Sequence, residues 1–203
     1  MEEYSPVRYT VEERRYLLMM KWIKRLCSLI LLCLLIAGGI LLFQGYREYR
    51  EALSGKSVEE MARQIESIDN YTSLDELPQT YIDAVLAVED KRFYEHPGID
   101  PIAIGRALLN DIRAGEYVEG GSTITQQLAK NQYFTQEKRL VRKVAEMFMA
   151  FKIEAELDKD KILELYVNSI YFGNGYQCVG DACRAYFGKE PSEMTFDECT
   201  LLA

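Results

Sequence analysis

One segment of the chain places a carboxylate at the end of a predicted apolar helix. Residues 89–98 read Glu-Asp-Lys-Arg-Phe-Tyr-Glu-His-Pro-Gly. A carboxylate such as Glu89, held at the end of a helix before a Pro-Gly turn, could act as a general base. A solvated, charge-rich helix end is the ordinary alternative. His96 is the only histidine of the chain, so we expect it to form structural hydrogen bonds rather than a usual histidine-based metal site.

A second segment has the composition of an anion-binding turn. Residues 120–131 read Gly-Gly-Ser-Thr-Ile-Thr-Gln-Gln-Leu-Ala-Lys-Asn. Glycines before a helix start leave backbone N–H groups free to point at an anion. Ser122 could equally be an ordinary N-cap. The segment lacks the Gly-Lys-Ser/Thr pattern of nucleotide-binding loops, which argues against a nucleotide site.

Two further segments are less specific when each is taken alone. Arg142 and Lys143 lie four and three residues before Glu146, so either can share a helix face with it. They form either a surface salt bridge or a clamp that neutralises a phosphate leaving group. The aromatic residues of 161–173 (Lys-Ile-Leu-Glu-Leu-Tyr-Val-Asn-Ser-Ile-Tyr-Phe-Gly) are best explained by core packing.

The spacing of apolar residues and caps predicts an almost entirely α-helical domain. Strand-like alternation is nearly absent. Capping boxes are expected at Ser57, Ser73 and Thr195, each with a Glu three residues later, and Asp158 to Asp160 should cap another helix. The expected helices cover about 46–70, from after Pro78 to about Phe93, 101–114, 123–131, 138–157, 161–168, 180–187, and a segment after Thr195.

An uncharged apolar run near the N-terminus predicts a membrane anchor. Residues 26–43 form eighteen uncharged positions, long enough to cover most of a hydrocarbon core of roughly 30 Å. A removed secretory signal is the alternative, but its apolar core would be shorter and a small-residue cleavage site would follow. Cations are more numerous before the run than after it, so the positive-inside rule keeps the N-terminus in the cytoplasm and exports the rest.

Charge and cysteine content narrow the remaining possibilities. The net charge of −8 argues against a nucleic-acid partner, and any anion site must be a local cluster of cations. Three cysteines follow the apolar run: Cys178, Cys183 and Cys199. We expect three buried small side chains, although one disulfide and a free thiol would also be possible.

The four segments occur in an order that identifies a family. The chain resembles the peptidoglycan glycosyltransferase domain in four ordered motifs. They are EDKRFYEHPGID, GGSTITQQLAKN, RKVAE and KILELYVNSIYFG, and AYFGK follows them. That domain occurs in class A penicillin-binding proteins and in monofunctional membrane-anchored transglycosylases. The resemblance covers about residues 77–203, and the monofunctional form is the closer match because no transpeptidase domain follows. The resemblance implies a lysozyme-like, all-α fold. It also implies an enzyme that polymerises lipid II at the outer face of the bacterial cytoplasmic membrane.

The resemblance also implies roles for particular residues. In an inverting displacement, Glu89 would deprotonate the acceptor hydroxyl. Glu146 would be the second essential carboxylate, acting near the pyrophosphate through a divalent cation (magnesium or manganese) or by orienting basic groups. The remaining motif positions would bind substrate or shape the cleft: Asp90, Phe93, His96, Gly121, Ser122, Thr123, Gln126, Gln127, Lys130, Asn131, Lys138, Arg142, Lys143 and Asn168.

The expected organisation follows from the anchor and the motifs together. We expect a cytoplasmic segment (1–25), a single transmembrane helix (26–43), a stalk (44–72) and a glycosyltransferase domain (73–203). Relatives of this family continue past the equivalent of residue 203, so the domain is expected to be truncated at its C-terminus. Many relatives also carry Arg where this chain has Lys138 followed by Arg139, which puts bidentate phosphate contact there in doubt.

The expected partners are lipid II, lipid-linked glycan, the bilayer and other cell-wall synthesis proteins. Exposed apolar residues within 99–112 are expected to dip into that bilayer. Two other readings stay open. A lytic muramidase would need one dominant acid and no pyrophosphate clamp, and a non-catalytic paralogue would serve as a membrane scaffold.

Overall fold

The computed structural model describes residues 10–116, 120–135 and 139–203, so the predicted substrate-binding residue Lys138 lies outside the described residues. The chain divides into two compact units, Met1–Phe43 and Gln44–Ala203, which are considered separately. Helix α1 (Val11–Gly55) contributes to both. The boundary between the units coincides with the end of the predicted transmembrane run.

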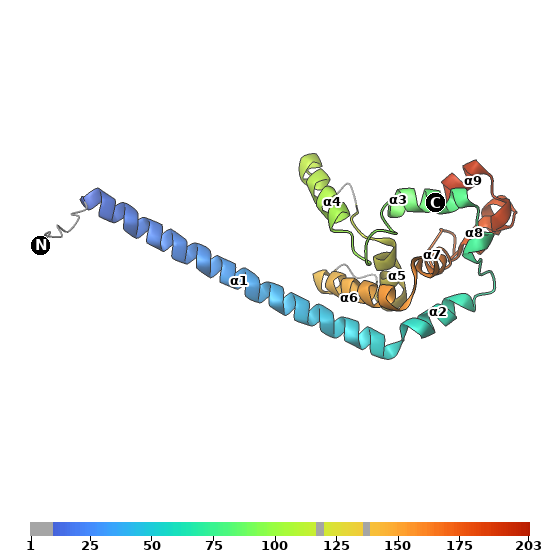
Figure 1. Ribbon diagram of the computed structural model, residues 1–203, viewed down its shortest axis with the longest axis horizontal. Coiled ribbons are helices and arrows are strands. Elements are labelled where there is room, and N and C mark those ends of the chain that lie inside the picture. Colours follow the sequence, from blue (N-terminus) through green and yellow to red (C-terminus); the bar gives the residue numbers. More distant parts are fainter. Residues whose placement is uncertain (1–9, 117–119, 136–138) are drawn as a thin grey trace, which may run out of the picture. The chain divides into compact units, whose positions relative to one another are not determined.

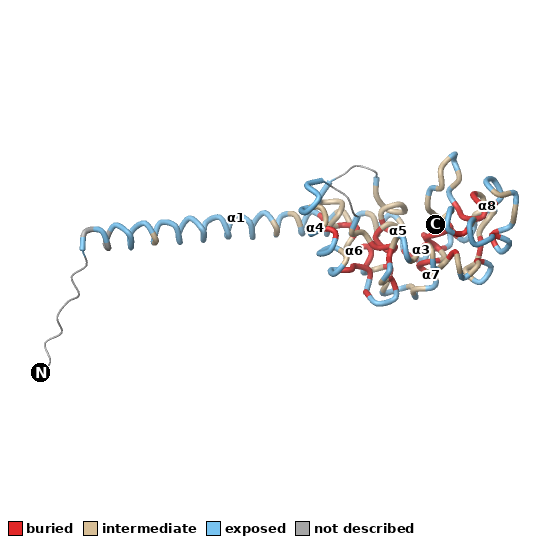
Figure 2. The backbone as a smooth tube through the Cα atoms, turned by 90° about the horizontal axis from the view of Figure 1, so that it is seen from above, coloured by how far each residue is buried: buried red, intermediate tan, exposed pale blue. Residues whose placement is uncertain are grey.

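The first unit consists of the N-terminal part of α1. Most of its large apolar side chains are exposed, including Trp22 and Phe43, and Figure 2 shows this part of α1 mostly in the colour of exposed residues. Within the described residues, this is the one helix that is long and apolar enough to cross a membrane. An exposed apolar surface of this length is costly in water and favourable in a bilayer.

The second unit is helical throughout, and the residues that the structure describes contain no strand (Figure 1). This confirms the all-α prediction. After α1 its elements are α2 (Val58–Glu66), η1 (Leu74–Glu76), α3 (Gln79–Glu89), α4 (Pro101–Ala114), α5 (Ile124–Tyr133), α6 (Leu140–Glu156), α7 (Lys159–Val167), α8 (Val179–Phe187), η2 (Pro191–Glu193) and α9 (Phe196–Leu202).

Helix α5 lies at the centre of this unit and packs on α6 and α7, while α3 packs on α9. The core between them consists of buried apolar side chains such as Leu128, Met149 and Ile162, which have no exposed surface. Figure 2 shows buried segments on α5, α6 and α7. Val58 and Met61 of α2 belong to the same core. The segment 44–72, predicted to be a stalk, therefore supplies part of the folded unit.

The local caps form largely as predicted. Ser73 and Thr195 each complete a capping box with the Glu three residues later, and Asp158 caps α7 through the Lys161 N–H. Ser57 caps α2 by accepting the Glu60 N–H at 3.1 Å. The three cysteines after the apolar run are buried and free, which confirms the packing interpretation.

The predicted end of α3 is wrong by four residues. The helix ends at Glu89, not near Phe93. Asp90 leaves the helix with φ −159° and ψ 80°, because its carboxylate is held by partners outside the helix. It accepts hydrogen bonds from His96 Nε2 (2.9 Å) and from the Ile124 N–H (3.1 Å). The end of α3 is therefore tied to the start of α5.

Helix α4 is fastened at its N-terminus by a buried carboxylate. Asp100 caps the helix by accepting the Ile102 and Ala103 N–H groups at 2.9 and 3.0 Å. Arg92 donates to the same carboxylate through two nitrogens at 3.0 and 2.9 Å. Burial alone would raise the pKa of Asp100, but the hydrogen bonds from Ala103, Arg92 and Ile102 outweigh it and hold the pKa below its ordinary value.

This network predicts a pH-dependent contribution of Asp100 to stability. A carboxyl whose pKa is lowered in the folded state stabilises above its unfolded pKa, and that stability is lost as the pH falls through the folded pKa. We expect Asp100→Asn to lower the free energy of unfolding by about 2 kcal/mol at neutral pH, and the difference to shrink below about pH 4.

Urea unfolding in detergent at neutral and acidic pH measures this difference. Asp69→Asn, at an exposed carboxyl, is the control and should change little at either pH. A loss from Asp100→Asn that is equal at both pH values would contradict the assignment.

Candidate active site

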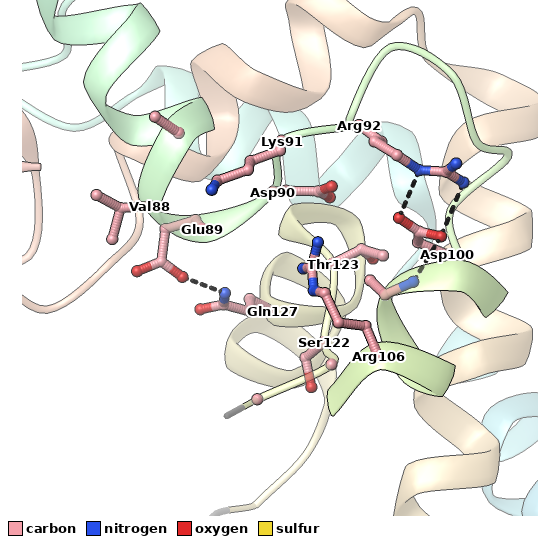
Figure 3. Close-up of a pocket in the computed structure, with 14 residues that line it drawn as sticks. Val88, Glu89, Asp90, Lys91, Arg92, Asp100, Arg106, Ser122, Thr123 and Gln127 are labelled. Carbon is pink, nitrogen blue, oxygen red and sulfur yellow. Dashed lines mark hydrogen bonds and ion pairs between the residues drawn. The ribbon is translucent and has the colours of Figure 1, made fainter. Parts of the chain in front are cut away.

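Glu89 and Gln127 stand together on the border of two cavities. Glu89 is the last residue of α3, Gln127 lies on α5, and the amide Nε2 donates to Glu89 Oε2 at 2.6 Å (Figure 3). Both residues line a cavity of about 590 Å³ and a second one of about 1020 Å³. The predicted base is half-buried, so it can reach a group that enters from either side.

The first cavity is polar and is bordered by cations. Lys91, Arg106 and Ser122 line it (Figure 3), and Gly121 lines it as well. A side chain at Gly121 would begin with a Cβ only 3.1 Å from Ile104 Cα. Glycine lets the loop that carries Ser122 pass close to α4 without this tight contact.

A buried ion cluster lies next to Ser122. Glu146 is 1% exposed, with Arg142 Nε 2.9 Å from its Oε1 and Lys143 Nζ 3.1 Å from its Oε2. Lys143 also donates to Ser122 Oγ at 2.6 Å. Glu146 thus holds two cations in place, and one of them reaches the edge of the first cavity. Such a fixed pair of cations can stabilise an anionic leaving group.

The second cavity has an aromatic wall. Tyr171, Phe172 and Tyr186 line it, and Lys130 and Asn131 of α5 contribute polar groups. Aromatic faces with a few polar groups suit the apolar faces and hydroxyls of sugar rings. The predicted residues Lys130 and Asn131 therefore lie in a different cavity from Ser122.

Several predicted substrate-binding residues are buried and engaged with the protein itself. His96 Nε2 donates to Asp90, and its Nδ1 accepts the Gly98 N–H at 3.2 Å. Thr123 caps α5 and donates to the Gly98 carbonyl at 2.7 Å. Gln126 Oε1 accepts the Thr123 N–H at 3.1 Å. These groups hold the loop after α3 against the start of α5 and so position Glu89 and Gln127.

Two other predicted residues have similar internal roles. Phe93 is 1% exposed and lies in the core. The side-chain amide of Asn168 caps α7 and also holds Thr72. Its Oδ1 accepts the Thr72 N–H at 2.9 Å, and its Nδ2 donates to the Thr72 carbonyl at 2.7 Å. Phe93 and Asn168 therefore support the residues of the site, and neither lines one of the two cavities.

The sequence interpretation missed residues that line the cavities. Lys91 lies inside the first motif, and Arg106 is a cation within the otherwise apolar stretch 101–109 of α4. Tyr166 was explained as core packing, yet its hydroxyl donates to Gln127 Oε1 at 3.3 Å. A cation in an apolar helix was the one signal that could have pointed to Arg106.

The groups around Glu146 do not fit a metal ion held by the protein alone. Within residues 10–116, 120–135 and 139–203, no three His, Cys, Asp or Glu side chains are grouped so that they could hold a metal ion. Both Glu146 oxygens already face Arg142 and Lys143, whose charges oppose a further cation. The magnesium or manganese ion stays a prediction.

Comparison with known families decides the classification of the chain. A family model described as transglycosylase matches residues 54–203. The chain belongs to the transglycosylase family. The match includes α2, in agreement with its packing in the core. The all-α architecture of the second unit is that of the lysozyme-like transglycosylase domain.

Curated relatives of this transglycosylase are penicillin-binding proteins. Penicillin-binding protein 1A of Aquifex aeolicus is 52% identical over 133 residues, covering 66% of this chain and 18% of the relative. Penicillin-binding protein 1F of Bacillus subtilis is 50% identical over 131 residues, covering 64% and 18%. Penicillin-binding protein 1A of Haemophilus influenzae is 42% identical over 183 residues, covering 87% and 21%.

This transglycosylase therefore spans about a fifth of the length of those relatives. Together with the apolar helix of spanning length, the family places it among membrane-anchored proteins.

Proposed function

We propose that this transglycosylase is a peptidoglycan glycosyltransferase that polymerises lipid II into β-1,4-linked glycan strands. The observation that carries the proposal is the position of Glu89, hydrogen-bonded to Gln127 on the border of two cavities. A glycosyl transfer needs a base between two sugar sites and a stabilised leaving group on one side. The cluster of Ser122, Lys143 and Glu146 supplies the second requirement.

The proposed step is an inverting displacement. Glu89 takes the proton from the acceptor 4-hydroxyl, whose oxygen attacks the anomeric carbon of the donor sugar. The bond from that carbon to the phosphate oxygen breaks, and the lipid pyrophosphate leaves with the electron pair. Lys143 and Ser122 receive the negative charge on the departing diphosphate, and Arg142 adds to the positive field around Glu146. An α-linked donor thus gives a β-linked product.

The cation cluster favours a transferase over a lytic muramidase. Hydrolysis of a glycan strand involves no diphosphate, so a muramidase would have no use for Arg142 and Lys143 beside Ser122. The purified full chain should consume labelled lipid II and leave preformed glycan strands intact. Cleavage of the strands without use of lipid II would support the muramidase, and inactivity on both would support a scaffold.

The membrane arrangement extends this proposal. The N-terminus lies in the cytoplasm of a bacterial cell, α1 crosses the cytoplasmic membrane once, and the catalytic unit faces outwards. The excess of cations before the apolar run supports this orientation. Lipid II and the lipid-linked glycan then share a leaflet with the enzyme, which raises their effective concentration. Other cell-wall synthesis proteins are further proposed partners.

Helix α4 is proposed to dip into the same bilayer. Ile102, Leu108 and Ile112 are 61%, 60% and 69% exposed. Ile112→Asp should lower the rate of lipid II consumption roughly tenfold in liposomes, because a charge there opposes insertion. In detergent solution the rates should agree within about twofold.

Ile112→Leu is the control and should keep the wild-type rate in liposomes. Ile104 is a poorer site for this test because it packs against Gly121. Equal rates of Ile112→Asp and wild type in liposomes would exclude a role for this surface in lipid contact.

A further inference from the structure

Tyr166 lies behind the proposed catalytic carboxylate, on α7. Its side chain is 2% exposed, and its hydroxyl donates to Gln127 Oε1 at 3.3 Å. The other end of the same amide, Nε2, donates to Glu89 at 2.6 Å. Three side chains from three different helices therefore form one hydrogen-bonded chain that ends on Glu89.

The chemistry of the three groups permits one orientation of the amide. An ionised carboxylate only accepts hydrogen bonds, so it needs the NH₂ end of Gln127. Turning the amide over would point its oxygen at the carboxylate oxygens, and the two would repel each other. A hydroxyl that donates to Oε1 opposes that turn. Burial, then Glu89 and Asp90, raise the pKa of Tyr166, which keeps its hydroxyl proton available for donation.

We propose that Tyr166 is a positioning residue whose hydroxyl holds Gln127 in the orientation that presents Nε2 to Glu89. The amide then holds the carboxylate at the border of the two cavities. This inference rests on the proposed function, in which Glu89 accepts the proton of the acceptor hydroxyl.

Tyr166→Phe removes the hydroxyl and keeps the buried ring. The amide can then turn over, and an amide oxygen next to Glu89 favours the protonated carboxyl. We expect kcat for glycan synthesis to fall roughly fivefold with KM within about twofold. The acidic limb of the pH–rate profile should move upwards by about 0.5 to 1 pH unit, the change expected from one hydrogen bond.

Other charged groups around Glu89 are unchanged by this substitution, so the pH profile reports on the amide. They line the two cavities on the loop after α3, on α4 and on α5: Asp90, Lys91, Arg92, Asp100, Arg106 and Lys130.

A double-mutant cycle separates positioning from a general packing effect. In a Gln127→Met background the hydroxyl has no amide to orient, so adding Tyr166→Phe should change kcat by less than about twofold. Tyr81→Phe is the matched control. Tyr81 is also buried, and its hydroxyl has no hydrogen-bond partner among the residues that the structure describes, so the rate and pH profile should stay at wild-type values. Losses from Tyr166→Phe and Gln127→Met that multiply would overturn the inference.

A measurement independent of turnover completes the test. The side-chain NH₂ signal of Gln127 in the full chain in detergent is identified by its loss in Gln127→Met. It should titrate with Glu89, and the titration should disappear in Glu89→Gln. In Tyr166→Phe the midpoint should rise by about 0.5 pH unit or more. An unchanged midpoint overturns the inference. A shifted midpoint in a protein that makes no glycan would support the role of Tyr166 while rejecting the proposed function.

Discussion

Glu89→Gln is expected to lower the initial rate of lipid II polymerisation by roughly 10² to 10⁴-fold, the usual contribution of a positioned general base. The substitution keeps the size of the side chain and can still accept the hydrogen bond from Gln127 Nε2. It removes only the capacity to take up a proton. Because Glu89 is half-buried at the end of α3 and lies outside the core, the melting temperature should stay close to that of the wild type.

The matched control for this prediction is Asp83→Asn. Asp83 lies on the same helix, is exposed, and accepts a hydrogen bond from Gln79 at 2.9 Å. Asp83→Asn should leave the polymerisation rate within about twofold of the wild-type rate. A rate loss shared by both variants would indicate damage to α3, and a normal rate in Glu89→Gln would mean that another group takes the proton.

Glu146→Gln is expected to affect both stability and activity. Removing the charge leaves Arg142, whose side chain is 11% exposed, without its carboxylate partner. Breaking such a buried pair costs about 3 kcal/mol of unfolding free energy. Lys143 loses its second anchor and no longer points firmly at Ser122. The rate should fall by at least about 10²-fold, the loss seen when a stabiliser of developing charge is removed.

Glu156→Gln tests whether the burial of Glu146 is the reason for the expected losses of stability and rate in Glu146→Gln. Glu156 pairs with Lys152 at 2.6 Å on the same helix and at the same spacing, but at the surface. Exposed pairs contribute little, so this variant should keep both its unfolding midpoint and its rate. Equal effects of the two substitutions would contradict the account of Glu146 as the holder of a cation pair.

Local features of the fold could be predicted from the sequence, and long-range ones could not. The caps at Ser73, Asp158 and Thr195 depend on residues within one turn, and they form as predicted. The end of α3 depends on Asp90 and its bond to Ile124, 34 positions away. Apolar periodicity contains no information about that partner, so the predicted helix continued to Phe93.

The site shows the same division. A carboxylate before a Pro-Gly turn drew attention to Glu89 from its position alone. Its pairing with Gln127 joins α3 to α5 across 38 positions, and the aromatic pattern around Tyr166 gave no sign that its hydroxyl reaches that amide. Asn168 matched a cleft position, yet its amide is used to hold Thr72. Only the packed helices distinguish a residue that lines a cavity from one that supports it.

We propose that this transglycosylase joins lipid-linked sugars by base-assisted transfer at Glu89, and the product formed from labelled lipid II in liposomes tests this proposal. The full chain is compared as wild type and as Glu89→Gln. We expect a ladder of glycan strands from the wild type, digestible by a muramidase specific for β-1,4 bonds, and at most about 1% of that product from Glu89→Gln. Equal ladders from both proteins, or a product resistant to the muramidase, would contradict it.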